Sequence, residues 1–233
     1  MENTENALNK LISNARKGKR KFDSLFPIYG LFGTVQELMK NFFLIEEVCR
    51  LDRLLEIQEK RVNPKIPINI KVYGKGDDLE NWPGKERILE IRGEFGLEQF
   101  STRLKHGNLC FAAYSNGEFV GFSWLELPPV TEAGYSLSQD EAWNFDSWTF
   151  VDFRRKHVFH MLKQAIFNYM RKNRPEIRNL GTHVYTWNKA SLLGNQRIGY
   201  KITRLELKIV IFGFHKVVPL NKQIPVNLIM RQD

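Results

Sequence analysis

The spacing of hydrophobic residues predicts a chain that alternates between helices and short strands. Between residues 35 and 60, hydrophobic residues recur every three or four positions, which is the period of an amphipathic helix. After Pro64 and Pro67, residues 66–72 alternate between hydrophobic and polar side chains, which predicts a short strand. A further helix is expected over residues 97–105.

The second half of the chain carries clearer signals. The dipeptide Asn116-Gly117 joins two hydrophobic runs, 110–114 and 119–127, as the turn of a β-hairpin does. A strand rich in aromatic residues is expected next, and hydrophobic residues at helical spacing then predict a helix. The expected elements of this half are strands over 141–151, 182–186 and 201–212 (two strands), and helices over 155–172 and from 189.

This order of strands and helices predicts an α/β sandwich built on a mixed sheet. We expect two units along the chain. Residues 1–62 would form a basic and helical extension packed on the core, and residues 63–233 would form one domain.

Charge bears on the partners more than on the fold. The 233 residues are 42% hydrophobic and 26% charged, which is typical of a folded globular chain. The formal net charge of +9 suits a polyanionic partner, such as CoA with its phosphates, an anionic membrane surface or a nucleic acid. The densest basic run, residues 16–21, fits either a solvated segment or a contact with an anionic surface.

The sequence contains no membrane-spanning or secretory signal. No hydrophobic run approaches the ~20 residues of a membrane helix, and the first residues hold no signal-peptide core. Two cysteines, Cys49 and Cys110, are too few for a disulfide framework. We therefore expect a cytoplasmic protein with inert thiols, whose oligomeric state the sequence leaves open.

The sharpest segment for chemistry is the junction between the aromatic strand and the helix that follows it. Arg154, Arg155 and Lys156 stand where the first amides of a helix have no partner inside that helix. These amides, the helix dipole and the three cations would together bind a phosphate or pyrophosphate. The same residues also fit an ordinary helix start with solvated basic side chains, so spacing alone leaves both interpretations open.

Three segments taken together resemble the GNAT superfamily of acyltransferases. Residues 149–159 resemble its acyl-CoA-binding turn, and they align without gaps with a bacterial subgroup associated with surface-polysaccharide loci. The segment from Asn188 to Ser191, followed by Gly199, and the hairpin over 116–122 resemble two further GNAT segments. The resemblance covers about residues 40–213. It implies a mixed, mostly antiparallel central sheet flanked by helices, with an N-terminal helical extension.

The resemblance also implies an activity. The chain would transfer an acyl group, with acetyl expected, from acyl-CoA to the amine of a small molecule by direct attack and without a metal. The subgroup suggests an amino sugar or a glycan precursor as the acceptor. An amide near Phe150 or Val151 would polarise the thioester carbonyl, and the edge of the strand would pair with the pantetheine arm. The residues implied to bind acyl-CoA are Phe150, Val151, Arg154, Arg155, Lys156, His157, Val158, Phe159, Asn188 and Ser191.

Three positions depart from the family pattern. His157 stands where the turn usually has glycine, so its side chain would either crowd the phosphate or donate a hydrogen bond to it. Phe159 departs from the residue usual at its position in the turn. Asn195 stands at the position of the frequent general-acid tyrosine, and an amide cannot protonate a leaving thiolate efficiently. A catalytically inactive module that binds a ligand or a partner is therefore an alternative.

Sequence alone does not single out a general base or a metal site. Asp146 and, second, His183 are the candidate bases. Asp146 is a carboxylate on or beside an expected strand, as is Glu126, and His183 lies on the strand that would face the cleft in the GNAT topology. His157 and His160 form a pair without the further ligands that zinc needs, so no metal is expected. A longer acyl donor, on CoA or on an acyl carrier protein, is a further alternative. Nucleic-acid binding ranks last among the alternatives, because it rests on charge alone.

Overall fold

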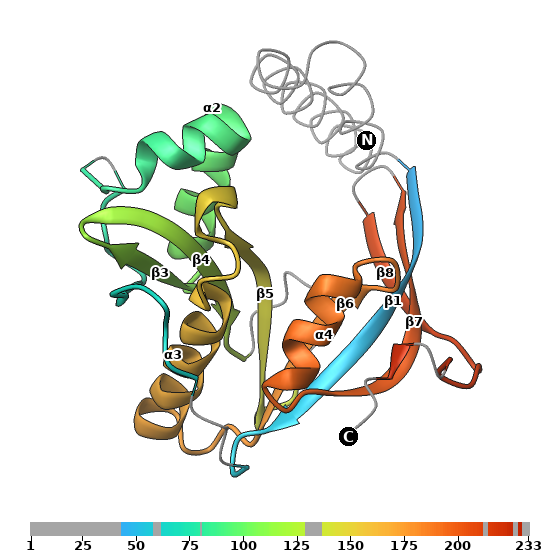
Figure 1. Ribbon diagram of the computed structural model, residues 1–233. Coiled ribbons are helices and arrows are strands. Elements are labelled where there is room, and N and C mark those ends of the chain that lie inside the picture. The colour runs from blue at the N-terminus through green and yellow to red at the C-terminus, as the bar shows by residue number, and fades with distance from the viewer. Residues whose placement is uncertain are drawn as a thin grey trace, which may run out of the picture.

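The structure, a computed structural model, describes residues 43–57, 62–79, 81–128, 137–211, 214–225 and 228–229 (Figure 1). The basic run at 16–21 and most of the expected N-terminal extension lie outside these residues. Within them, eight strands form one sheet in the order β2-β3-β4-β5-β6-β1-β7-β8. Every neighbouring pair is antiparallel except β5 and β6, which run parallel, so the expected mixed and mostly antiparallel sheet is confirmed.

The elements follow one another as strands interrupted by three α-helices and one 3-10 turn. Their bounds are β1 (Phe43–Leu54), β2 (Asn69–Tyr73), α2 (Lys85–Lys105), β3 (Leu109–Ser115), β4 (Glu118–Glu126), β5 (Glu141–Thr149), η1 (Val151–Phe153), α3 (Val158–Asn173), β6 (Asn179–Tyr185), α4 (Lys189–Arg197), β7 (Lys201–Ile211) and β8 (Phe214–Pro219).

The helix expected over residues 35–60 is wrong for residues 43–54, which form the central strand β1. This strand pairs with β6 on one side and with β7 on the other. Cys49 and Leu51 are buried on one face of the sheet, while Arg50 and Asp52 join polar contacts on the other. A period of two is thus present within the segment, but the hydrophobic spacing also satisfies a helix. Only pairing with strands 125 to 168 residues away decides between them.

Other element boundaries differ in ways that glycine explains. The hairpin at Asn116-Gly117 is confirmed, because both residues have positive φ, 51° and 84°, as a type I′ turn requires. Helix α2 begins at Lys85, twelve residues before the expected start, because two glycines break up its pattern. One of them, Gly93, has a φ of 64° and kinks the helix. The second closing strand, β8, extends to Pro219, beyond the expected end at 212.

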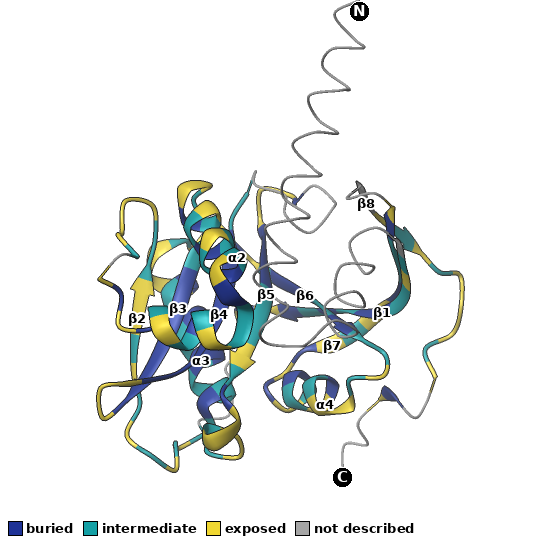
Figure 2. Ribbon diagram, turned by 90° about the horizontal axis from the view of Figure 1, so that it is seen from above, coloured by how far each residue is buried: buried dark blue, intermediate teal, exposed yellow. Residues whose placement is uncertain are grey.

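The helices cover the two faces of the sheet (Figures 1 and 2). Helices α3 and α4 supply Leu162, Ile166 and Leu192 to a core on one face. Helix α2 supplies Ile88 and Phe100 to a second core on the other face, next to aromatic side chains of β4. Burying each such side chain contributes about 1.5–3 kcal/mol relative to an exposed position, so both cores hold the sheet between its helices.

One charged side chain lies inside the layer formed by α3 and α4. Lys163 is only 1% exposed, and its Nζ atom lies 5.0 Å from the centre of the Phe159 ring and 5.7 Å from that of Tyr200. Burial lowers the pKa of Lys163 to about 7, because the charged form loses its hydration. The native protein therefore holds this amine largely uncharged under mildly alkaline conditions.

This buried amine predicts a pH dependence of stability. In the unfolded chain Lys163 binds a proton below about pH 10.4, but in the native state only below about pH 7. Because the unfolded state binds more protons in between, the free energy of unfolding should fall as the pH is lowered from 10 to 7. Lys163→Met should flatten this slope and raise the free energy of unfolding at pH 7 by more than about 1 kcal/mol. Urea denaturation of both proteins at several pH values measures the free energy of unfolding and its slope with pH.

Lys172→Met on the exposed face of the same helix is the matched control, and it should leave the slope unchanged. Equal slopes in wild type and Lys163→Met would contradict the assignment.

Candidate functional site

A slot opens in the sheet where β5 and β6 separate. The two strands pair at only three positions, from Glu141 opposite Asn179 to Trp143 opposite Gly181. Beyond this point β5 continues to Thr149 alongside β4, and β6 continues to Tyr185 alongside β1. The two facing edges, residues 144–149 and 182–185, therefore have no strand between them in the described part of the chain (Figure 1).

The edge of β5 that faces the slot contains a bulge. Phe145 pairs with Trp124 and Trp148 pairs with Phe122, so a three-residue step in β5 stands opposite a two-residue step in β4. Asp146 lies within this step with a φ of 46°. Such an extra residue bends a strand and re-aims the side chains that follow it.

The backbone that points into the slot belongs to Thr149 rather than to Phe150. The amide of Phe150 donates a hydrogen bond to the carbonyl of Val120 in β4, at 3.1 Å. Because backbone groups alternate in direction along a strand, those of Thr149 point away from β4 and toward the slot. The expected role of the Phe150 amide as a donor to a thioester carbonyl does not fit this geometry, since that amide already has a partner.

A cavity of about 750 Å³ lies at the end of the slot, where β5 ends and α3 and α4 begin. Its fixed cations are Lys65, Arg154, Arg155 and Arg197, and no Asp or Glu is among its described lining residues. The start of α3, with its unpartnered first amides, forms one wall. Charge, dipole and amides therefore all favour an anion in this cavity.

The turn into α3 is held in conformations that favour glycine. Arg155 has a φ of 63° and His157 a φ of 67°, both in the left-handed region. At the start of α4, in contrast, Asn188 provides a side-chain cap, because its Oδ1 accepts from the amide of Ser191 at 3.1 Å. The cavity is thus enclosed by one strained and one well-capped helix start.

Most of the residues expected to bind acyl-CoA lie together in this cavity. Those that line it are Arg154, Arg155, His157, Val158, Phe159, Asn188 and Ser191. The other three do not line it: Phe150 is buried in the core on the α2 side, Val151 is exposed, and the ammonium of Lys156 lies 4.8 Å from the Phe153 ring centre.

The cavity also contains residues that sequence reasoning missed. Lys65 comes from the loop before β2, and no local pattern marks it. Arg197 lies at the end of α4, where a basic residue also suits the helix dipole. Ser147 and His160 line the cavity as well. The pKa of His160 is lowered, first by burial and then by the charges of His157 and Arg197.

The ring of His157 is tied to a neighbouring loop. Its Nδ1 lies 2.8 Å from the carbonyl oxygen of Asn63, so Nδ1 carries the proton and donates it. The amide of Lys65 bonds the carbonyl of Lys156 in the same turn, at 3.4 Å. His157 therefore connects the turn to the loop that carries the cation Lys65.

Asp146, the first candidate base, has its carboxylate held by arginines of α2. Arg92 donates two hydrogen bonds to it, at 2.7 and 2.6 Å, and Arg103 donates another. Burial alone would raise the pKa of Asp146, but the two guanidinium groups outweigh burial and hold it well below its usual range. A carboxylate held in this way accepts a proton poorly, and Asp146 does not line the cavity. The geometry therefore does not fit a general base.

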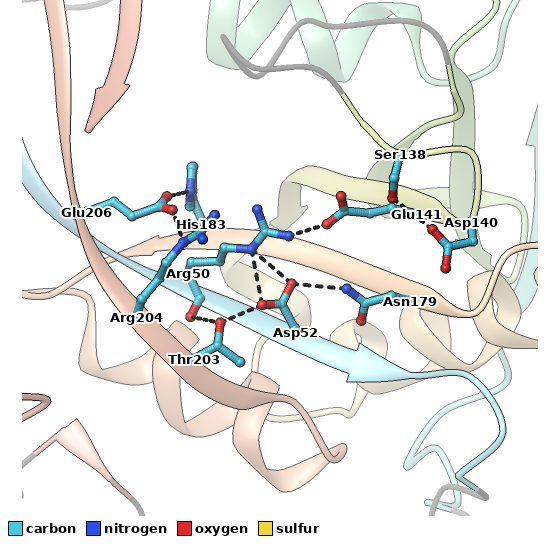
Figure 3. Close-up of polar contacts among 10 residues, drawn as sticks. All are labelled: Arg50, Asp52, Ser138, Asp140, Glu141, Asn179, His183, Thr203, Arg204 and Glu206. Atoms are coloured by element: carbon cyan, nitrogen blue, oxygen red, sulfur yellow. Dashed lines mark hydrogen bonds and ion pairs between the residues drawn. The ribbon is translucent and has the colours of Figure 1, made fainter. Parts of the chain in front are cut away.

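His183, the second candidate base, lies in a network of polar side chains on the α2 face of the sheet (Figure 3). Its Nε2 contacts a carboxylate oxygen of Glu206, which also accepts from Arg204. Burial raises the pKa of Glu206, but its contacts with His183 and Arg204 outweigh burial and lower it. Glu206 is only 2% exposed, so an ionised and buried carboxylate orients the imidazole.

The network continues toward the point where the strands part. Arg50 bonds Asp52 at 3.0 Å and also contacts Glu141, the first paired residue of β5 (Figure 3). The Trp143 ring packs edge-on against His183, with 4.8 Å between centres. His183 thus lies next to the junction of β5 and β6. Glu206 was not singled out by the sequence, since a glutamate within an amphipathic strand is ordinary.

The remaining sequence expectations concern protons, thiols, metals and membranes. Asn195 is buried and does not line the cavity, and its Nδ2 donates to the carbonyl of Ser191 at 2.9 Å. Cys49 and Cys110 are free and buried, and burial raises the pKa of both thiols. The described residues contain no cluster of three or more His, Cys, Asp or Glu suited to a metal. No helix among them is both long and apolar enough to cross a bilayer.

The left-handed turn predicts an opposite effect of glycine at two neighbouring arginines. Arg155→Gly should raise the free energy of unfolding by about 0.5–1 kcal/mol, because glycine adopts this φ without strain. Arg154 has a φ of −65°, where glycine relieves no strain and only adds freedom to the unfolded chain. Arg154→Gly should therefore lower the free energy of unfolding. Urea denaturation of both variants decides, and a loss of stability in Arg155→Gly as large as in Arg154→Gly would contradict the strain.

Comparison with known proteins gives structural neighbours only. No protein-family model matches the sequence, and no curated protein matches it. A tandem GNAT protein from the clavulanic acid biosynthesis pathway is 14% identical with a TM-score of 0.51, over 72% of this chain and 54% of that one. A conserved protein of unknown function from Staphylococcus epidermidis is 11% identical with a TM-score of 0.51, over 76% of this chain and 65% of that one. The chain spans less than two thirds of each neighbour, and its fold is that of the GNAT acyltransferases.

Proposed function

We propose that the chain transfers an acyl group, acetyl in the first instance, from acyl-CoA to the amine of a small molecule. The observation that carries this proposal is the cation-lined cavity at the start of α3, which lies at the end of the slot between β5 and β6. The fold shared with a tandem GNAT protein supports it. An amino sugar or a glycan precursor, suggested by the sequence resemblance, is the acceptor class to test first.

The cavity suits the diphosphate and 3′-phosphate of CoA. The first amides of α3 would bind the diphosphate, and Lys65, Arg154, Arg155 and Arg197 would supply countercharge. The pantetheine arm would extend along the slot as an added strand, with its amides bonded to the backbone of Thr149, whose carbonyl also accepts from the Nε of Arg154 at 3.4 Å. An amide of the same edge would polarise the thioester carbonyl.

The acceptor would approach from the α2 face, where His183 lies. His183, oriented by Glu206, would take a proton from the ammonium group directly or through one water. The free amine would then attack the thioester carbonyl, the C–S bond would break, and the thiolate of CoA would leave. The attacking nitrogen would lose its second proton to water, and water would deliver a proton to the thiolate, since Asn195 is buried and bonded to Ser191.

The phosphate assignment predicts the binding of acetyl-CoA and its salt dependence. Isothermal titration calorimetry should show binding that weakens as salt is raised. Arg154→Ala and Arg197→Ala should each weaken it about tenfold, because each removes one charge facing the phosphates. Arg174→Ala, an arginine outside the cavity, is the control and should bind like wild type. Binding that is unaffected by both cavity variants would defeat the phosphate assignment.

The base assignment predicts a loss of turnover without a loss of donor binding. With an amino sugar as acceptor and thiol release as the assay, His183→Gln should lower kcat about 10²–10⁴-fold. The affinity for acetyl-CoA should stay unchanged, because His183 does not line the donor cavity. Glu206→Gln should lower kcat less, since it removes only the group that orients the imidazole. Full turnover in His183→Gln would remove it from the mechanism.

A further inference from the structure

We propose that Asp146 is a positioning residue: with Arg92 and Arg103 it holds the bulge of β5, and this bulge determines which groups of β5 face the donor slot. The inference rests on the proposed function only in taking acyl-CoA as the ligand of the slot. It gives a role to Asp146, the first candidate base, whose ion pairs prevent it from acting as a base.

The bulge changes the face on which each following side chain lies. Phe145 packs on the α2 side, and so does Asp146, the very next residue. Beyond the bulge, residues 147–149 all line the donor cavity, and the contact of the Ser147 hydroxyl with Ser123 places Ser147 on the α3 side. In a regular strand Ser147 and Thr149 would share a face with Phe145, because alternate residues face the same way. A shift of one residue exchanges the two faces of a strand, so the bulge turns these residues toward the cavity.

Contacts on both faces support this exchange. On the α3 side, the Ser147 hydroxyl lies 2.7 Å from that of Ser123, and the Asn144 amide donates to the same Ser123 at 2.8 Å. Two β5 residues that are three apart thus meet one β4 residue, because the two between them face α2. The same shift decides the backbone directions, so without the bulge Thr149 would not present its amide to the slot.

The bulge needs a restraint because its backbone conformation is unfavourable. A non-glycine residue at positive φ costs on the order of 1 kcal/mol, although Asp tolerates it better than most residues. The carboxylate of Asp146 gains at least three hydrogen bonds from two guanidinium groups, and these outweigh that cost. Removing one partner from such a buried cluster leaves a charge without compensation.

The arginines are themselves fixed on the aromatic core beneath α2. The guanidinium of Arg103 lies 4.9 Å from the Phe145 ring centre and 5.3 Å from that of Trp124. That of Arg92 lies 5.0 Å from the Phe122 ring centre. Each guanidinium is therefore held in place by aromatic faces as well as by the carboxylate.

The kink in α2 allows both arginines to reach one carboxylate. Arg92 and Arg103 are eleven residues apart, which is about 16 Å along a straight helix. Gly93, the residue directly after Arg92, has non-helical angles, φ 64° and ψ −171°, and divides the helix there. Arg92 and Arg103 therefore lie on opposite sides of the kink and converge on the one carboxylate.

The test compares two ligands that share an adenosine with phosphates at its 3′ and 5′ positions. Only acetyl-CoA also carries the second phosphate of the diphosphate and the pantetheine arm. Acetyl-CoA uses both the cavity and the β5 edge, whereas adenosine 3′,5′-bisphosphate uses the cavity alone. Asp146→Gly keeps the positive φ accessible and removes the ion pairs. By calorimetry it should weaken acetyl-CoA at least about tenfold and leave the bisphosphate within about twofold. Asp146→Asn, which keeps a hydrogen-bond acceptor, should fall between wild type and Asp146→Gly.

Ile88→Val is the control for a merely structural effect, because it loosens the core under α2 and leaves Asp146, Arg92 and Arg103 unchanged. It should lower stability and leave the ratio of the two affinities unchanged. Equal weakening of both ligands in a folded Asp146→Gly, or no change in either, would overturn the proposal. If Asp146→Gly does not fold, Asp146→Asn and Arg103→Met undergo the same comparison and decide by the same ratio.

Hydrogen exchange separates this proposal from the proposed function. Amides of residues 144–150 should exchange faster in Asp146→Gly than in wild type, and Ile88→Val should not reproduce this increase. If wild type binds neither ligand, the proposed function is wrong. The hydrogen-exchange comparison still tests whether Asp146, Arg92 and Arg103 hold the bulge. Unchanged exchange at these residues would overturn the proposal that Asp146 holds the bulge, whatever the result of the binding measurements.

Discussion

The structure depends on one constraint, which is that the parallel pairing of β5 and β6 ends at Trp143 and Gly181. The indole of Trp143 packs so closely on Gly181 that a Cβ atom there would come within 2.2 Å of the ring. No other residue type fits at this position without moving the indole. Beyond it the strands separate, and the cavity, the free edge of β5 and the network around His183 all lie around the opening.

The two faces of the sheet would then divide the chemistry between them. On the α3 and α4 face, helix starts and cations gather without a carboxylate among the described lining residues, which suits a polyanion. On the α2 face, carboxylates, arginines and His183 lie among aromatic side chains, which suits proton transfer. A thioester lying in the slot would be reached from both faces.

The sequence predicts the local features well and the long-range ones poorly. The turn at 154–157, the helix start after Asn188 and the hairpin at Asn116 follow from short patterns, and the structure places the turn and this helix start in one cavity. Strand β1 was missed because its pairing is decided by distant strands. Lys65, Arg197 and Glu206 were missed for the same reason, since the tertiary fold alone brings them to the site. Asp146 was predicted as a general base, and its ion pairs with α2, which do not fit that role, have no signature in its own segment.

The most direct test of the account is a crystal structure of the protein with acetyl-CoA. The account predicts that the diphosphate lies at the first amides of α3 between Arg154 and Arg197. It also predicts that the pantetheine arm runs between β5 and β6, bonded to the backbone of Thr149, with the acetyl carbon accessible from the side of His183. Acetyl-CoA bound elsewhere, or bound in the cavity with its pantetheine arm outside the slot, would contradict it.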